Sequence, residues 1–191
     1  MKKIKLGDVL RVKRGKSLPG EFDSRKETPF IRLTLGNFSY PMNGFKNNIS
    51  KDDLFYSGSV EEVFILNKGD IITPLTEQVR GLLGSTAIIP ESNKYIQSGD
   101  IGLVIPNENV LDKKYAYYLI QSKIVRDQLS AAAQQTKIRH TSPEKIEDCV
   151  AWIPDLSQQA YVGNLLDSID KKIQCNIKIN DNLSYQSAMV A

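Results

Sequence analysis

The chain has 191 residues, 41% of them apolar and 25% charged, and its 25 basic and 22 acidic residues give a formal net charge of +3. This composition is typical of a globular protein with its own hydrophobic core, and it excludes collagen-like, low-complexity and wholly disordered classes. The sequence contains neither the run of about 20 apolar residues that a membrane helix needs nor the apolar segment of a signal peptide. The two cysteines, Cys149 and Cys175, have no metal-ligand spacing and form no disulfide framework, so we expect a cytoplasmic protein.

The basic residues are concentrated in two segments. Residues 2–16 contain seven lysines and arginines against one acid, Asp8, and residues 123–140 contain four against Asp127 alone. Basic clusters on a nearly neutral chain indicate a phosphate-binding face. A solvated basic surface without a ligand would give the same pattern, so the clusters alone leave both interpretations open.

Up to Ile105 the sequence alternates between short apolar stretches and polar loops. The apolar stretches predict strands at 9–12, 29–35, 60–66, 71–72, 85–89 and 101–105. Two longer polar, glycine-containing segments, 16–28 and 73–84, predict loops. This half of the chain is therefore expected to form a domain rich in strands and loops.

From Leu111 onwards the pattern becomes helical. Leu111 and Asp112 have the chemistry of a helix start, and apolar residues recur at helical spacing to about Ala133. The spacing predicts that Tyr115 and Tyr118 pack in the core, although a stacking platform would also use tyrosines. Ser142 followed by Pro143 predicts a second, short helix, and residues 149–153 predict a last strand.

The last segment predicts one long helix with Asp155 as its N-cap. Its seam positions alternate at spacings of four and three residues over about four heptads, which is the pattern of a coiled coil. They are Val162, Leu166, Ile169, Ile173, Asn176, Asn180, Leu183, Ser187 and Val190. Such a helix would be about 50 Å long, so we predict that the first seven of these residues contact a partner helix rather than the helix's own domain. Asn176 and Asn180 would fix the register of the pair.

Motifs for catalysis are missing from the sequence. Gly15-Lys16-Ser17 resembles the end of a P-loop, but position 10 holds Leu10 instead of the required glycine. His140 is the single histidine and has no companion residues for a metal site or a hydrolytic triad. We therefore expect a binding protein without catalytic residues, metal or cofactor. Two alternatives stay open: a protein-interaction adaptor that works through the helix, and a nuclease that assembles carboxylates from distant loops.

The order of several short motifs resembles one known family. The chain has Gly-Lys-Ser-Leu-Pro from position 15, Pro-Phe-Ile-Arg-Leu from 29, Lys-Gly-Asp-Ile-Ile from 68 and Leu-Asp-Lys-Lys-Tyr from 111. Gln134 to Ile138 and the junction Ile-Pro-Asp-Leu-Ser-Gln-Gln from 153 follow. In this order and spacing they are similar to the DNA-specificity (S) subunit of type I restriction-modification systems. The family's usual Glu-Gln at the helix start is Gln158-Gln159 here.

The resemblance implies an α+β fold: a mixed, β-rich target-recognition domain with a few helices over 1–154, then a spacer helix over 155–191 that forms an antiparallel coiled coil. Family subunits usually carry two such units, so the chain resembles half of a subunit, and a homodimer or a second half would be needed to read a bipartite site. The implied partners are double-stranded DNA and separate methyltransferase (M) and restriction (R) subunits, which would carry out the catalysis.

Within this interpretation we expect the basic residues and the two polar loops to contact DNA. Lysine and arginine would bind phosphates, while Arg25, Gln78 and Arg80 would read bases, because arginine suits guanine and glutamine suits adenine. The predicted DNA-contacting residues are Arg11, Lys13, Arg14, Lys16, Arg25, Lys26, Gln78, Arg80, Lys137, Arg139 and His140.

Overall fold

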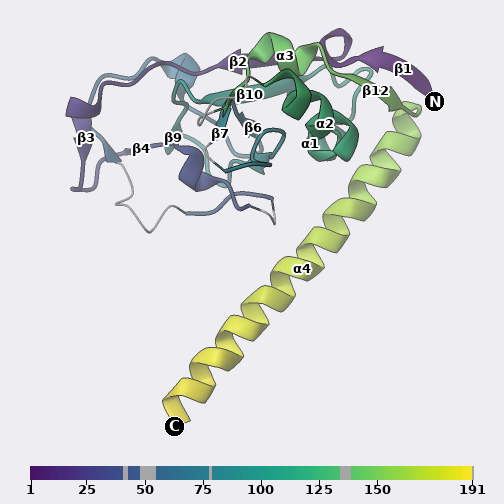
Figure 1. Cartoon of the computed structure of the whole chain (residues 1–191). Helices are drawn as coiled ribbons and strands as arrows, with labels where there is room; N and C mark the ends of the chain where they lie inside the picture. Colours follow the sequence, from purple (N-terminus) through teal and green to yellow (C-terminus); the bar gives the residue numbers. More distant parts are fainter. Residues whose placement is uncertain (41–42, 48–54, 78, 134–138, 191) are drawn as a thin grey trace.

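The computed structural model describes residues 1–40, 43–47, 55–77, 79–133 and 139–190. They form an α+β domain from which one long helix projects (Figure 1). The strands are β1 (Lys2–Lys5), β2 (Leu10–Arg14), β3 (Asp23–Ser24), β4 (Phe30–Arg32), β5 (Phe55–Tyr56), β6 (Ile71–Pro74), β7 (Thr76–Glu77), β8 (Ala87–Ile88), β9 (Tyr95–Ile96), β10 (Ile101–Pro106), β11 (Arg139–His140) and β12 (Val150–Ile153). The helices are α1 (Lys113–Gln121), α2 (Lys123–Ala132), α3 (Pro143–Glu147) and α4 (Leu156–Val190). The predicted fold class and the long C-terminal helix are confirmed.

The central sheet has the strand order β2-β10-β6-β8 and is antiparallel throughout. Val12 of β2 lies opposite Val104 of β10, and Leu103 of β10 lies opposite Ile72 of β6. Leu10 and Val12 are buried while Arg11 and Lys13 are exposed, because successive side chains of a strand point to opposite faces. Strand β2 therefore contributes apolar residues to the core and basic residues to the surface.

A second sheet, with the order β3-β5-β4-β9, lies at the end of the domain far from the start of α4 (Figure 1). Its β4–β9 pair is parallel and its other pairs are antiparallel. At the opposite end, β1 pairs antiparallel with β12, so that Lys2 lies opposite Ile153 and Lys5 opposite Val150. Helix α4 begins directly after β12, so the start of the helix lies next to the N-terminal strand β1.

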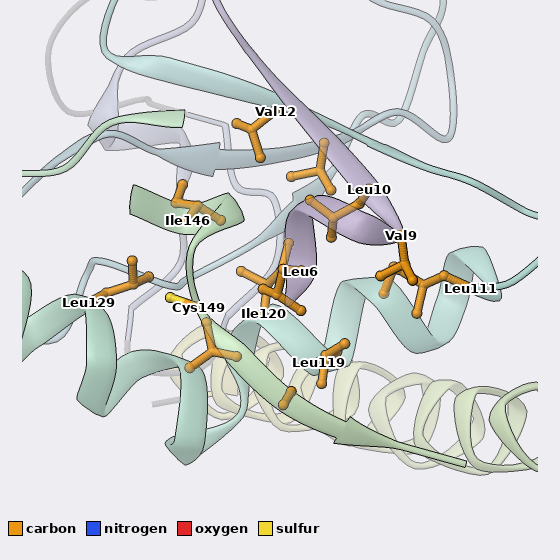
Figure 2. Packing of buried hydrophobic residues seen from close by; sticks show 14 of the residues in the cluster. Leu6, Val9, Leu10, Val12, Leu111, Leu119, Ile120, Leu129, Ile146 and Cys149 are labelled. Carbon is orange, nitrogen blue, oxygen red and sulfur yellow. The ribbon is translucent and has the colours of Figure 1, made fainter. Parts of the chain in front are cut away.

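The largest hydrophobic core joins the first strands to the helices (Figure 2). Leu6 and Leu10 from the N-terminal segment meet Ile120 of α1, Leu129 of α2 and Ile146 of α3, and all five are buried. A second cluster includes Leu33, Ile72 and Ile101 and draws residues from both sheets. The predicted core packing of the tyrosines holds, because Tyr115 and Tyr118 are half-buried and pack against the first cluster.

Several sequence-based predictions of secondary structure are wrong. The loop predicted over 16–28 contains β3, and the loop predicted over 73–84 contains the end of β6 and all of β7. Residues 60–66 form a 3-10 helix at Glu62–Phe64 in place of a strand, since Phe64 N–H and Ile65 N–H bond back to the carbonyls of Glu61 and Glu62. The helix predicted from Leu111 to Ala133 is two helices, because Ser122 adopts an extended conformation (φ −61°, ψ 147°) between α1 and α2. No helix in the described ranges is both long and apolar enough to cross a membrane.

Candidate nucleic-acid interface

Strand β2 is the edge of the central sheet and presents Arg11 and Lys13 to solvent. The Val12 N–H on this edge donates to Oε1 of Glu147 over 2.7 Å, so helix α3 pairs a group that an edge strand would leave open. The same carboxylate group lies 3.8 Å from Nη1 of Arg11, whose guanidinium also donates to the carbonyl of Gly7. Helix α3 thereby satisfies part of the open edge of β2, while the two basic side chains of the strand stay on the surface.

The segment after β2 packs closely against residues 97–99. Arg14 donates from Nη1 to the carbonyl of Gly99 over 2.9 Å, and a Cβ added at Gly15 would lie 2.3 Å from the carbonyl oxygen of Ser98. Lys16 forms an exposed ion pair with Glu61. Gly15-Lys16-Ser17 is thus a close crossing of two backbones, in agreement with the absence of the P-loop pattern.

The loop 79–84 is held from beneath by a buried carboxylate. Glu77 is only 2% exposed, and its Oε2 accepts from the backbone N–H groups of Gly81 and Leu83, each over 3.0 Å. Arg126 of α2 donates from Nη1 to the carbonyl of Gly81 over 3.1 Å, and burial lowers the pKa of this guanidinium. Buried hydrogen bonds of this kind rigidify the segment that they join.

The same loop points two side chains outwards, Val79, which is 61% exposed, and Arg80. Gly81 follows with φ +98°, and a Cβ there would lie 2.3 Å from the hydroxyl of Tyr40, so only glycine fits this turn. Arg80 consequently stands on a backbone of fixed shape, which is what a base-reading side chain requires.

Arg139 belongs to the support of this loop. Its Nη1 lies 2.7 Å from Oε1 of Glu77, and its side chain is 15% exposed. The sequence predicts a contact of Arg139 with phosphate, but in the structure its guanidinium pairs with an internal carboxylate. His140, the next residue, is exposed, and its Nδ1 lies 3.3 Å from Oγ1 of Thr76 across the β7–β11 pair.

A chain of contacts connects several of the predicted residues. Arg14 reaches Gly99, Asp100 accepts a hydrogen bond from Thr76, and Thr76 contacts His140. Arg139 and Glu77 then lead to the turn that carries Arg80. Arg25 and Lys26 are exposed next to β3, at the far end of the domain (Figure 1). Gln78 and Lys137 lie outside the described residues.

Sequence reasoning missed Glu77 and Arg126, the two residues that shape the loop 79–84. An acid within a polar segment is normally exposed, and nothing in the sequence distinguishes Glu77 from such a residue. Arg126 lies on a helix whose charged neighbours Lys123 and Asp127 form an ordinary exposed pair. The role of Arg126 depends on a contact with Gly81, which lies more than forty positions away along the chain, and the role of Glu77 depends on its burial. Neither cause has a local signal in the sequence.

On α4 the predicted coiled-coil residues lie along one face. Val162 and Leu166 are half-buried, while Ile169, Ile173, Asn176, Asn180 and Leu183 are exposed. The face that contacts α1 holds Gln159, Gly163, Asp167 and Asp170, and it lies about 90° around the helix from the predicted seam at about 100° per residue. The seam is therefore open to a partner, and the coiled coil itself stays a prediction.

In the part of the chain that the structure describes, no group of three or more His, Cys, Asp or Glu side chains could hold a metal ion. The geometry offers instead a basic strand edge, a supported turn with an exposed arginine, and an open helix face. These features suit binding to an extended, negatively charged partner.

Three solved structures resemble this fold. One comes from work on the complex assembly and conformational transition of the type I R-M system (13% identity, TM-score 0.63, 91% of this chain and 39% of that chain). The others are the type I S subunit from M. genitalium (16%, 0.61, 91% and 40%) and the HsdS subunit from Thermoanaerobacter tengcongensis (16%, 0.59, 91% and 38%). At this identity the likeness concerns the fold alone, and the chain spans about two fifths of the length of these relatives.

No curated protein matches the chain in sequence. A family model does match, over residues 1–185, and it is described as the type I restriction modification DNA specificity domain. The match includes both the globular domain and nearly all of α4. The chain belongs to the family of type I restriction-modification DNA specificity domains.

Proposed function

We propose that this chain directs a type I restriction-modification system to its DNA sequence, with residues 1–154 as the target-recognition domain and 155–191 as a spacer helix. The match of the family model over residues 1–185 carries the proposal. The likeness to solved S subunits in fold supports it.

Recognition would divide between phosphate contacts and base contacts. Arg11 and Lys13 on the outer side of β2 suit phosphate binding, which gives affinity without sequence information. Arg80, on its supported turn, suits a bidentate contact with guanine in the major groove. Arg25 and Lys26 would reach DNA next to β3, at the far end of the domain (Figure 1), and so would extend the contact along the duplex.

A second copy of the chain would complete the reading unit. The seam of α4 would pack antiparallel against the same seam of the partner, burying Ile169, Ile173 and Leu183 and placing one domain at each end of the pair. Such a dimer has two-fold symmetry, so its two domains would read identical half-sites in opposite orientations.

Methylation and cleavage would belong to the separate M and R subunits, and this chain would contribute binding only. We expect the adenine methyl donor to bind the M subunit. The chain then needs no cofactor of its own.

The test is to co-express the chain with a type I M subunit and map the methylated adenines in the host genome. We expect one bipartite motif in the form of an interrupted palindrome. A non-palindromic bipartite motif would contradict the homodimer and indicate pairing with a different half-subunit. A chain that binds the M subunit but directs it to no DNA sequence would favour the adaptor, and metal-dependent cutting of DNA by the isolated chain would favour a nuclease.

A further inference from the structure

The direction in which α4 leaves the domain is fixed by a set of contacts with α1, which we call the α1–α4 clamp (Gln159, Gly163, Asp167 and Asp170 against Asp112, Lys114 and Tyr118). The clamp extends over the first half of α4. Beyond it, residues 171–183 are all exposed. The rest of the helix therefore follows the direction that the clamp gives it (Figure 1).

The base of the clamp is a buried amide. Gln159 is 1% exposed, its Oε1 accepts from the N–H of Asp112 over 3.0 Å, and its Nε2 donates to the carbonyls of Val110 and Pro154. One turn later Gly163 lets the two helices meet, since a Cβ there would lie 3.0 Å from both Cβ of Lys114 and N of Tyr115. These contacts fix the position of the start of α4. The tilt of the helix is determined by the residues further along it.

Two side chains of α1, Lys114 and Tyr118, hold that tilt through three polar contacts. Lys114 donates from Nζ to Oδ1 of Asn164 over 2.9 Å and to Oδ2 of Asp167 over 3.0 Å. The hydroxyl of Tyr118 donates to Oδ2 of Asp170 over 2.8 Å. Burial is the main cause, and this carboxylate the second cause, of a raised pKa for the tyrosine. Tyr118 is the outermost of these contacts and so has the longest leverage on the helix.

A small change of tilt becomes a large displacement at the far end. About 20 residues separate Asp170 from Val190, or about 30 Å of helix, so that a tilt of about 10° moves the end by about 5 Å. That exceeds the rise of about 3.4 Å per base pair of DNA. In an antiparallel pair both clamps act on the distance between the two domains.

We infer that Lys114 and Tyr118 are specificity-determining residues that act through α4: by fixing its tilt they set the number of base pairs between the two half-sites. The inference rests on the proposed function for its DNA consequence. Neither residue is among the predicted DNA-contacting residues, so the half-site sequence itself would not depend on them.

The first experiment measures geometry without DNA. A spin label on the exposed native Cys175 and a second on Lys68→Cys report the position of α4 relative to the domain, with labelled chains diluted in unlabelled ones. We expect the Lys114→Met, Tyr118→Phe double variant to shift or broaden the electron–electron double resonance distances by about 3 Å, because Cys175 lies about 18 Å of helix beyond Gly163, where the start of α4 is fixed. The control, Lys171→Met, removes a 2.9 Å ion pair to the same Asp167 without touching α1 and should leave the distances unchanged.

The second experiment selects DNA duplexes with variable spacing between half-sites. The wild type should enrich one spacing, and the double variant should enrich neighbouring spacings with the same half-site sequence. Unchanged distances in the double variant, or an altered half-site sequence, would overturn the inference. A wild type that enriches no DNA would overturn the proposed function, and the spacing role with it, even where the label distances shift.

Discussion

Oε1 of Glu77 lies 2.7 Å from Nη1 of Arg139, with the carboxylate fully inside the domain and the guanidinium at its margin. The second oxygen of the same carboxylate accepts from the N–H groups of Gly81 and Leu83. One side chain thus links the β7–β11 strand pair to the turn that carries Arg80. The two strands contain only two residue pairs, so this link adds to a short ladder that is also joined by the bond from Thr141 N–H to the carbonyl of Leu75.

Replacing Glu77 by alanine should destabilise the protein strongly. The variant leaves the Arg139 guanidinium without its carboxylate and frees two backbone N–H groups, and losing one partner of a buried pair costs about 3–5 kcal/mol. Urea unfolding measures the loss. Glu91→Ala is the control, because its pair with Lys94 is exposed on both sides and is worth less than about 1 kcal/mol. Equal losses in the two variants would contradict the supporting role of Glu77.

Arg80→Ala should lower affinity for the cognate site and relax the choice of base at one position. A bidentate contact with guanine is worth about 1–3 kcal/mol of discrimination, which corresponds to roughly 5- to 150-fold. Selection from a randomised DNA library measures the change. A variant that binds all sequences more weakly by the same factor would show that Arg80 contacts phosphate and does not read a base.

Lys13→Ala should weaken binding to every DNA sequence alike. One phosphate contact fewer lowers the slope of log affinity against log salt concentration by about 1. Titrations of the wild type and the variant at several salt concentrations measure this slope. Lys178→Ala, an exposed lysine on α4 away from the domain, should leave the slope unchanged.

The double variant Ile169→Asp, Ile173→Asp should be a monomer. Both side chains are exposed on the seam of α4, and charges there would oppose burial against a partner helix. Light scattering should give a mass near 21.4 kDa for the variant and twice that value for the wild type. Lys178→Asp, about half a turn away from the seam, serves as the matched control, and a double variant of unchanged mass would exclude the coiled coil.

The two thiols should react very differently. Burial, and then the charge of Asp148, raises the pKa of Cys149 from 9.0 to about 11, so its contribution to stability is present below pH 9 and is lost as the pH rises towards 11. At pH 8 a thiol reagent should modify the exposed Cys175 alone, and denaturation should release the second thiol. Two reactive thiols in the native protein at pH 8 would contradict the packing around Cys149.

The features that the sequence predicts well are those with local causes. Helix starts at Asp112, Ser142 and Asp155 are predicted because each side chain caps its own helix: Asp112 accepts from Tyr115 N–H over 2.8 Å, and Asp155 accepts from Gln158 N–H over 2.9 Å. The apolar stretches of β2, β6 and β10 are likewise evident, because their side chains fill the core.

The features that it misses depend on tertiary contacts. Ser122 has no glycine or proline beside it to announce the break between α1 and α2. The heptads predict an apolar face on α4, but they do not predict that Gln159 and Gly163 turn a different face towards α1. In the candidate interface, the sequence does not distinguish Arg139 from Arg80. Only the pairing of Arg139 with the buried Glu77 shows that Arg139 supports the loop, whereas Arg80 is exposed.

The pairing of β1 with β12 has a mechanical consequence. Tension or torque along α4 enters the domain at two places, the α1–α4 clamp and β12, and at β12 it acts as shear on the ladder from Lys2–Ile153 to Lys5–Val150. The first five residues of the chain thus hold the strand from which α4 continues. Deleting them would remove the strand that pairs with β12, and a load on α4 would then separate β12 from the domain more easily.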